Sequence, residues 1–250
     1  MKLLLVGDVH GRWNEFNDHL LRLHQFYRFQ AVLQLGDFGL YPEILKLYDD
    51  QKIRFIVPVY VIDGNHEDHL WLAKQSKSEL KSWSERFNLH FFNRGHVFNW
   101  HKSKIGVIGG ALNVDRPQKN FQGVANYITK EDREKVIHSF NKHKIDCIVS
   151  HSCPSNIGIE MKSKKTFEMG VNLHIRAAGF DPGPESDCGE KELTEIWYKL
   201  NHKPVHWIFA HFHQFHLKKI AQTNFWALPE FDCPPILFWD NELKEIIKID

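Results

Sequence analysis

Three short apolar runs near the start of the chain each end in a polar cluster. Their length and their polar ends predict buried strands that run into loops. Because Pro58 cannot donate a hydrogen bond to a neighbouring strand, we expect the third strand to begin after it. The runs and the clusters that follow them are Lys2–Val6 before Gly7-Asp8, Ala31–Leu35 before Gly36-Asp37, and Phe55–Ile62 before Asp63-Gly64-Asn65-His66.

Two segments between these runs have the spacing of helices. Apolar side chains recur every three or four residues within Trp13–Tyr27, and Pro42–Tyr48 has a shorter pattern of the same kind. The predicted order is therefore strand, helix, strand, helix, strand. Such units form a parallel sheet whose ligands collect beyond the carboxyl ends of its strands. We expect the polar clusters to lie together at that edge.

The second half of the chain repeats this pattern. Thr129 can cap a helix over Lys130–His143, with Asp132 three residues further on, and a second helix is predicted over Gly189–Leu200. The stretch Ser152–Ser186 has little hydrophobic periodicity and is long for a loop without a function, so we expect it to be a mobile lid over the substrate. Strands are predicted at Lys104–Ile108, Ile145–Ser150 and His206–Ala210, and antiparallel strands and hairpins at Phe215–Ala221, Phe225–Leu228, Ile236–Asp240 and Leu243–Ile249.

The amino-acid composition excludes several classes of protein. A chain of 250 residues with 42% apolar residues is ordinary for a folded α/β domain, and we expect residues 1–250 to form one. Lys and Arg number 32 against 31 for Asp and Glu, which excludes nucleic-acid binding through bulk charge alone. The apolar runs are too short for a membrane span or a signal peptide. Four cysteines without a Cys-x-x-Cys pair suit reduced thiols and a cytoplasmic location.

Histidine is abundant, with 17 residues, and several stand at the ends of the apolar runs. Asp8 and His10 are two residues apart, as are His211 and His213, and in extended backbone such pairs point to the same side. Asp37 has two oxygens that can bridge two cations. Asn65 offers an amide oxygen, and His151 follows a further predicted strand. These oxygen and nitrogen donors, without thiolates, suit two divalent ions.

At this point the chain resembles the calcineurin-like metallophosphoesterases. The matching motifs run from residue 7 to residue 213 and are Gly7-Asp8-Val9-His10-Gly11, Gly36-Asp37, Gly64-Asn65-His66-Glu67, Ser150-His151 and His211-Phe212-His213. The resemblance implies a four-layer α/β/β/α sandwich of two mixed sheets with flanking helices. It also implies that Asp8, His10 and His213 hold one metal, that Asn65, His151 and His211 hold the other, that Asp37 bridges them, and that His66 is the catalytic acid.

Two departures from the family pattern limit which branches of the family the chain resembles. The protein Ser/Thr phosphatases and the dinucleoside-tetraphosphate hydrolases usually continue the second motif as Gly-Asp-x-x-Asp-Arg-Gly. Here Gly36-Asp37 is followed by Phe38-Gly39-Leu40-Tyr41, without the Asp-Arg pair. Ala210 stands where the family usually has Gly. The chain therefore looks more like a divergent bacterial or phage-type phosphoesterase.

The residues support a hydrolytic mechanism. Two bound cations can lower the pKa of a bridging water so that hydroxide attacks phosphorus, and His66 can protonate the departing alkoxide. Asp63 and Asp68 are candidates to orient the His66 ring, although a turn or surface role is favoured for both. Arg116, ahead of Arg94, is a candidate for binding the phosphoryl oxygens, with pairing to Asp115 as its alternative. Lys162, Lys164 and Lys165 could steer an anionic substrate, but a solvated role is favoured.

Two classes of function follow from this pattern. The first is a hydrolase of phosphate mono- or diesters that uses two ions of Mn, Fe or Zn and acts on a phosphate ester, with a nucleotide or a nucleic acid among the candidates. The second is a non-catalytic protein-binding scaffold with the same fold, as a retromer subunit of this superfamily is. A scaffold typically loses part of the ligand set, whereas every ligand position and His66 are filled here, which favours the enzyme. The sequence identifies neither the substrate nor the oligomeric state.

Overall fold

The computed structural model describes residues 1–112, 120–121, 124–159, 164–183 and 187–250. Its first sheet has six strands in the order β14-β13-β1-β2-β3-β4. Strands β1 to β4 are parallel to one another, while β13 is antiparallel to both β1 and β14. The bounds are β1 Lys2–Val6, β2 Ala31–Gln34, β3 Val59–Val61, β4 Leu89–Phe91, β13 Ile236–Asp240 and β14 Glu245–Ile249. The third predicted strand does begin after Pro58.

The second sheet also has six strands, in the order β11-β12-β10-β9-β6-β5. The four central strands are parallel, and the two edge strands are antiparallel to their neighbours. The bounds are β5 Val97–Trp100, β6 Ser103–Ile108, β9 Cys147–Ser150, β10 His206–Phe209, β11 His216–Ile220 and β12 Thr223–Ala227. A small antiparallel pair joins β7 (Asn120–Phe121) to β8 (Val124–Ala125).

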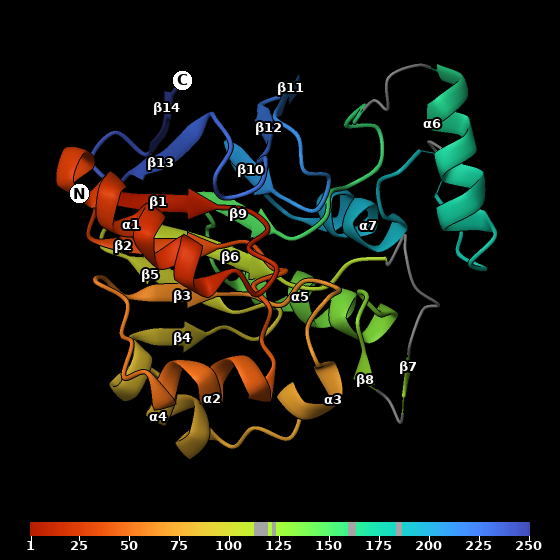
Figure 1. Cartoon of the computed structure of the whole chain (residues 1–250). Helices are drawn as coiled ribbons and strands as arrows, with labels where there is room; N and C mark the ends of the chain where they lie inside the picture. Colours follow the sequence, from red (N-terminus) through yellow and green to blue (C-terminus); the bar gives the residue numbers. More distant parts are fainter. Residues whose placement is uncertain (113–119, 122–123, 160–163, 184–186) are drawn as a thin grey trace.

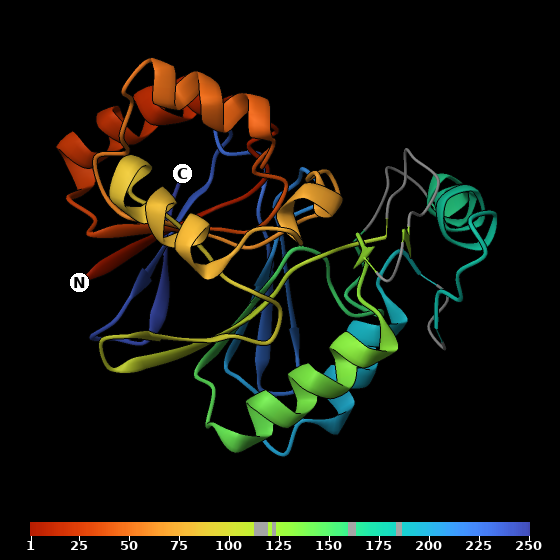
Figure 2. The same ribbon diagram turned by 90° about the horizontal axis from the view of Figure 1, so that it is seen from below.

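Helices cover the outer face of each sheet, and the inner faces pack against each other (Figure 1, Figure 2). In β1, Leu3 and Leu5 belong to the cluster that includes Val107 and Ile208 of the second sheet, so this cluster lies between the sheets. The alternate residue Leu4 packs in the cluster beneath the helices of the first sheet. These helices are α1 Trp13–Tyr27, α2 Pro42–Asp50, α3 His69–Leu72 and α4 Lys77–Phe87; α5 Lys130–Lys142 and α7 Lys191–Lys199 cover the second sheet.

The four-layer α/β/β/α sandwich of two mixed sheets is therefore confirmed. The prediction for the C-terminal runs is partly wrong. The pairs β11/β12 and β13/β14 are antiparallel as expected, but β12 lies parallel to β10, and β13 crosses to the first sheet beside β1. Hydrophobic pattern shows that a strand is buried but does not show which strand it joins.

Some helices were not predicted. Helix α4 has few apolar positions, although its capping box between Ser76 and Glu79 is a recognisable start signal. The stretch Ser152–Ser186 contains α6 (Lys164–Gly170) and a π-helix (Val171–Arg176), so it is not the irregular loop that its weak periodicity indicates. A role of this stretch as a lid stays a prediction. Across the described ranges, no helix is both long and apolar enough to cross a membrane.

Candidate metal centre

Two groups of potential metal ligands lie where the parallel strands of both sheets end. Asp8, His10 and His213 form one group. Asp37, His151 and His211 form the other, and in each group the ligand atoms lie within 4.8 Å of one another. The groups adjoin, because the backbone N–H of His211 donates to Asp8 Oδ2 (3.2 Å). The structure thus brings together side chains that are more than 200 residues apart in the chain.

Asn65 completes the second group. Its Oδ1 lies 3.2 Å from His151 Nε2, and its Nδ2 is buried without a hydrogen-bond partner among the described residues. All seven predicted metal-ligand candidates therefore lie at one site. Each follows a parallel strand: Asp8 and His10 follow β1, Asp37 follows β2, Asn65 follows β3, His151 follows β9, and His211 and His213 follow β10.

Backbone contacts hold the loops of the first sheet close together. The N–H groups of Val9 and His10 both donate to the carbonyl of Asp37, at 3.0 and 2.7 Å. Gly64 passes so near Asp37 that a Cβ there would lie 2.1 Å from Asp37 Oδ1. The close packing of Asp37 against the Asn65 loop therefore requires glycine at position 64.

A buried carboxylate, Glu67, joins the same two loops. Its Oε1 accepts from the N–H of Phe38, and its Oε2 accepts from the N–H of Gly64, both at 2.8 Å. In addition, the N–H of His66 donates to Asp37 Oδ1 (2.8 Å). Sequence reasoning placed Glu67 in a motif but gave it no role, because its partners are backbone groups that no residue pattern shows.

Contacts at Nδ1 set the direction of two of the imidazoles. His151 Nδ1 donates to the carbonyl of Leu35 (2.7 Å), which leaves Nε2 facing Asp37 Oδ2 at 3.3 Å. His213 Nδ1 pairs with Glu230 Oε1 (3.2 Å), which leaves Nε2 3.1 Å from His10 Nε2. Carboxylate or carbonyl partners of this kind orient histidine ligands in metal sites. Glu230 is itself held by Arg12 at 2.7 Å, and neither residue was predicted.

Close packing of buried carboxylates and imidazoles shifts the pKa values of the side chains at this site. Burial, reinforced by Asp37, raises the pKa of Asp8 to about 7. Burial alone would lower the pKa of His151, but Asp37 and Asp8 raise it to about 10. Burial and the neighbouring His151 lower the pKa of His211 to about 3. Buried oxygen and imidazole donors this close to one another suit a shared cation, and Asp8 Oδ1 is buried without a hydrogen-bond partner in the described part of the chain. The residues therefore fit a pair of divalent ions.

The expectation of extended backbone at the His-containing motifs is wrong. His10, His211 and His213 have φ values of 51°, 70° and 52°, in the left-handed region. Because the chain turns at His211 and His213, their imidazoles enter different groups instead of pointing to one side. The spacing of two residues identified the donors but not how the two groups divide them.

The proposed catalytic histidine lies at the edge of the centre. The ring of His66 contacts that of His10 edge-on, with 5.5 Å between centroids, and His66 is only partly buried. Its backbone is held at both ends, since Tyr41 Oη donates to the His66 carbonyl. Asp68 instead caps α3 by accepting from Trp71 N (3.0 Å), and Asp63 pairs with Arg94. Asp68 therefore has the turn role that the sequence favours, whereas Asp63 is neither a turn nor a surface residue but the buried partner of Arg94.

Arg94, the second candidate for binding the phosphoryl oxygens, is instead engaged by groups within the protein. Its guanidinium is buried and pairs with Asp63 (2.7 Å) and Asp132 (2.8 Å). It also donates to the carbonyls of Tyr127 and Ala125. Desolvation disfavours a free buried cation, and these acceptors commit Arg94 to joining β8 and α5 to the Asn65 loop.

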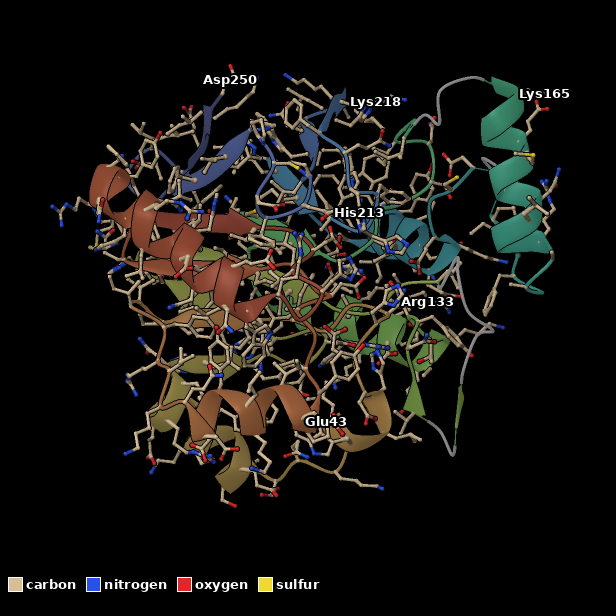
Figure 3. All side chains as sticks on the ribbon, in the orientation of Figure 1. Glu43, Arg133, Lys165, His213, Lys218 and Asp250 are labelled. Carbon is tan, nitrogen blue, oxygen red and sulfur yellow. The ribbon has the colours of Figure 1, made fainter. Side chains whose placement is uncertain are left out.

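Three of the other predicted cations lie outside the described side chains. Arg116 and Lys162 fall outside the described residues, and only the backbone of Lys164 is described. Lys165 is exposed on α6 at the outer edge of the molecule in Figure 3, whereas His213 lies near its middle.

Comparisons with known proteins agree with the fold. A family model described as calcineurin-like phosphoesterase matches residues 1–215. No curated protein matches the chain. The structure of TT1561 from Thermus thermophilus is similar, with 10% identity and a TM-score of 0.61 over 99% of this chain and 97% of that one. A dimetal phosphatase from Danio rerio is similar too, with 12% identity and a TM-score of 0.55 over 100% and 98%. At these identities, the likeness to solved structures shows the fold.

Proposed function

The chain belongs to the calcineurin-like phosphoesterase family and is a phosphoric ester hydrolase, and on that premise we propose that it cleaves phosphate mono- or diesters at a dinuclear metal centre. One observation carries the proposal. Two groups of three ligands adjoin at the ends of β1, β2, β9 and β10, and Asn65 after a fifth strand, β3, completes the second group. The chain lacks the Asp-Arg pair of the protein Ser/Thr and dinucleoside-polyphosphate phosphatases, so these substrates are not proposed.

We assign the ligands by their positions. Asp8, His10 and His213 hold one ion, and Asn65, His151 and His211 hold the other. Asp37 bridges both, since it is buried in the second group and its charge reaches Asp8 in the first. Two divalent ions bound there would supply a nucleophilic water at neutral pH and neutralise charge on the phosphoryl group. Mn, Fe and Zn all suit this ligand mixture, and manganese is our first choice for assays.

His66 is the proposed general acid. Its N–H is fixed on Asp37 and its carbonyl on Tyr41, so the backbone is held while the ring stays partly exposed beside His10. A ring in that position can reach the ester oxygen of a bound substrate and donate a proton to the departing alkoxide. It is not needed to complete either group of ligands.

The leaving group tests this role. Because p-nitrophenolate departs almost unaided and an alkoxide does not, His66→Ala should lose about 10²–10⁴-fold in kcat on alkyl phosphates and much less on p-nitrophenyl phosphates. Metal content should not change. His138→Ala, an exposed histidine on α5, is the matched control. Equal losses on both substrates with both metals retained would contradict the acid role, and loss of a metal would make His66 a ligand.

The location is a further proposal. All four cysteines are free, as the absence of a Cys-x-x-Cys pair predicts, and free thiols suit a cytoplasmic protein. We likewise propose that residues 1–250 form one domain, because residues of both sheets share one apolar cluster.

A further inference from the structure

A cavity of about 640 Å³ lies between the N-terminal ends of α5 and α7, outside the two groups of metal ligands. This volume is within the range of sites that hold small organic ligands. The two helices lie side by side and are joined by the ion pair between Arg133 and Glu192 (2.7 Å) (Figure 2). The cavity is therefore bounded on two sides by helices fixed against each other.

The wall of the cavity is connected to the metal centre on both sides. On one side, Tyr127 follows Asn126, whose Nδ2 donates to the carbonyl of Asn65 (3.5 Å). On the other side, the N–H of Glu190 donates to the carbonyl of Cys153 (2.9 Å), two residues after His151. Asn65 and His151 are proposed ligands of the same ion. These two bonds place the cavity beside the Asn65 and His151 side of the centre, which is the side toward which the organic part of a substrate is expected to extend.

The lining favours a flat, uncharged group over a second phosphate. Tyr127 and Phe180 face each other edge-on in the wall, with 5.1 Å between ring centroids. Four carboxylates line the cavity against two lysines, so an anion is disfavoured. One of the lysines, Lys191, is paired with Asp181 at 2.7 Å. Aromatic walls of this kind stack on the rings of nucleobases.

A buried acceptor adds specificity. Glu190 is 3% exposed and lines the cavity, and its Oε1 accepts from the N–H of Leu112 (3.0 Å). Burial raises the pKa of Glu190 to about 7, and its ionised form, which only accepts hydrogen bonds, favours a ligand with N–H donors. Amino and ring N–H groups of nucleobases are such donors, whereas an alkyl chain offers neither N–H donors nor a flat face to the aromatic pair.

We propose that this cavity binds the base of a nucleotide or of a nucleic-acid end, which makes the substrate of the centre a nucleoside phosphate ester. The inference rests on the proposed function for the chemistry at the phosphate. The binding of the base does not depend on that chemistry, because the cavity and its aromatic pair are separate from the proposed metal ligands.

The first test measures binding without hydrolysis. The four ribonucleosides adenosine, guanosine, cytidine and uridine are titrated calorimetrically into the full chain in excess EDTA. We expect at least one to bind saturably and Tyr127→Ala and Phe180→Ala each to weaken that binding about 10- to 100-fold. Tyr127→Phe should retain it. The matched controls are Tyr198→Ala and Phe26→Ala, at side chains that are 56% and 78% exposed.

The second test uses hydrolysis with Mn²⁺ and separates the two sources of a base. We expect the same alanine variants to lower kcat/KM for mononucleotides or for dinucleoside monophosphates, but not for methyl phosphate or bis-p-nitrophenyl phosphate. Preference for mononucleotides indicates free nucleotides, and preference for the dinucleotides indicates nucleic-acid ends. Absence of nucleoside binding, or binding unaltered in folded Tyr127→Ala and Phe180→Ala variants, would overturn the inference. Nucleoside binding without hydrolysis of any ester would overturn the proposed function alone.

Discussion

Replacing Glu67 by Gln tests how the two loops that carry Asp37 and Asn65 are held together. Both oxygens of the buried Glu67 accept from backbone N–H groups at 2.8 Å, one on each loop. Gln keeps one acceptor but turns an amide donor toward the other N–H. Burial and the charge of Asp37 raise the pKa of Glu67 to about 8, so the comparison is made at about pH 9, where the carboxylate is ionised. A hydrogen bond to a charged group contributes about 1.5–3 kcal/mol, and a buried donor without a partner costs about 1–3 kcal/mol. Since these two costs overlap, we expect the free energy of unfolding to fall by about 2–3 kcal/mol.

The same substitution should loosen the metal centre without removing a ligand. Contacts that orient metal ligands typically change metal affinity by about 10- to 100-fold, and we expect a loss of that size for Mn²⁺ in Glu67→Gln. Urea unfolding of the metal-free chain and calorimetric Mn²⁺ titration measure the two effects separately. Glu43→Gln, at an exposed glutamate in the first turn of α2, is the control (Figure 3). Wild-type stability and wild-type affinity in folded Glu67→Gln would refute the role given to this carboxylate.

Three further predictions concern charged groups. Asp37→Asn should lose both metal ions and His213→Ala only one, so elemental analysis that finds two ions in Asp37→Asn would contradict bridging. Arg94→Met should lower the free energy of unfolding by about 3–5 kcal/mol, because it leaves the buried Asp63 unpaired, whereas Arg86→Met, in an exposed pair, should cost about 1 kcal/mol or less. Burial opposes ionisation of Asp132, but Arg94 and Thr129 hold its pKa below the ordinary 3.8. The stability that ionised Asp132 gives to the fold should therefore be complete well above pH 3.8 and disappear as the pH falls through the lower pKa of the folded state. The difference in free energy of unfolding between wild type and Asp132→Asn, measured with urea, should thus be smaller at pH 2 than at pH 7.

Patterns of residues close together in the sequence were sufficient to predict much of the fold. The buried strands β1, β2, β6, β9 and β10 and the helices α1 and α5 follow from the spacing of apolar residues and from capping signals. The same pattern placed polar clusters after parallel strands, where ligands collect. It could not place β13 beside β1, because strand pairing depends on contacts between distant parts of the chain.

The residues that support the metal ligands could not be predicted for the same reason. Glu230 orients His213 and pairs with Arg12, which lies 218 residues earlier in the chain. Arg94 illustrates the opposite error. An arginine near a loop suggested a phosphate contact, yet its surroundings supply two carboxylates and two carbonyls. Whether a buried cation is available to a substrate depends on its neighbours in space.

The backbone conformation of the metal-ligand candidates explains why motif spacing identified them although their backbone is not extended as predicted. Asp37, His10, His211 and His213 all have positive φ values, between 51° and 70°. Such conformations cost residues other than glycine about 1 kcal/mol or more each, and they persist only where surrounding contacts determine them. Two N–H bonds to the Asp37 carbonyl and the N–H bond from His211 to Asp8 are contacts of that kind. The turns at these residues therefore bring donors that follow strands of two different sheets to one centre. If the backbone had stayed extended, these donors would have passed one another without meeting.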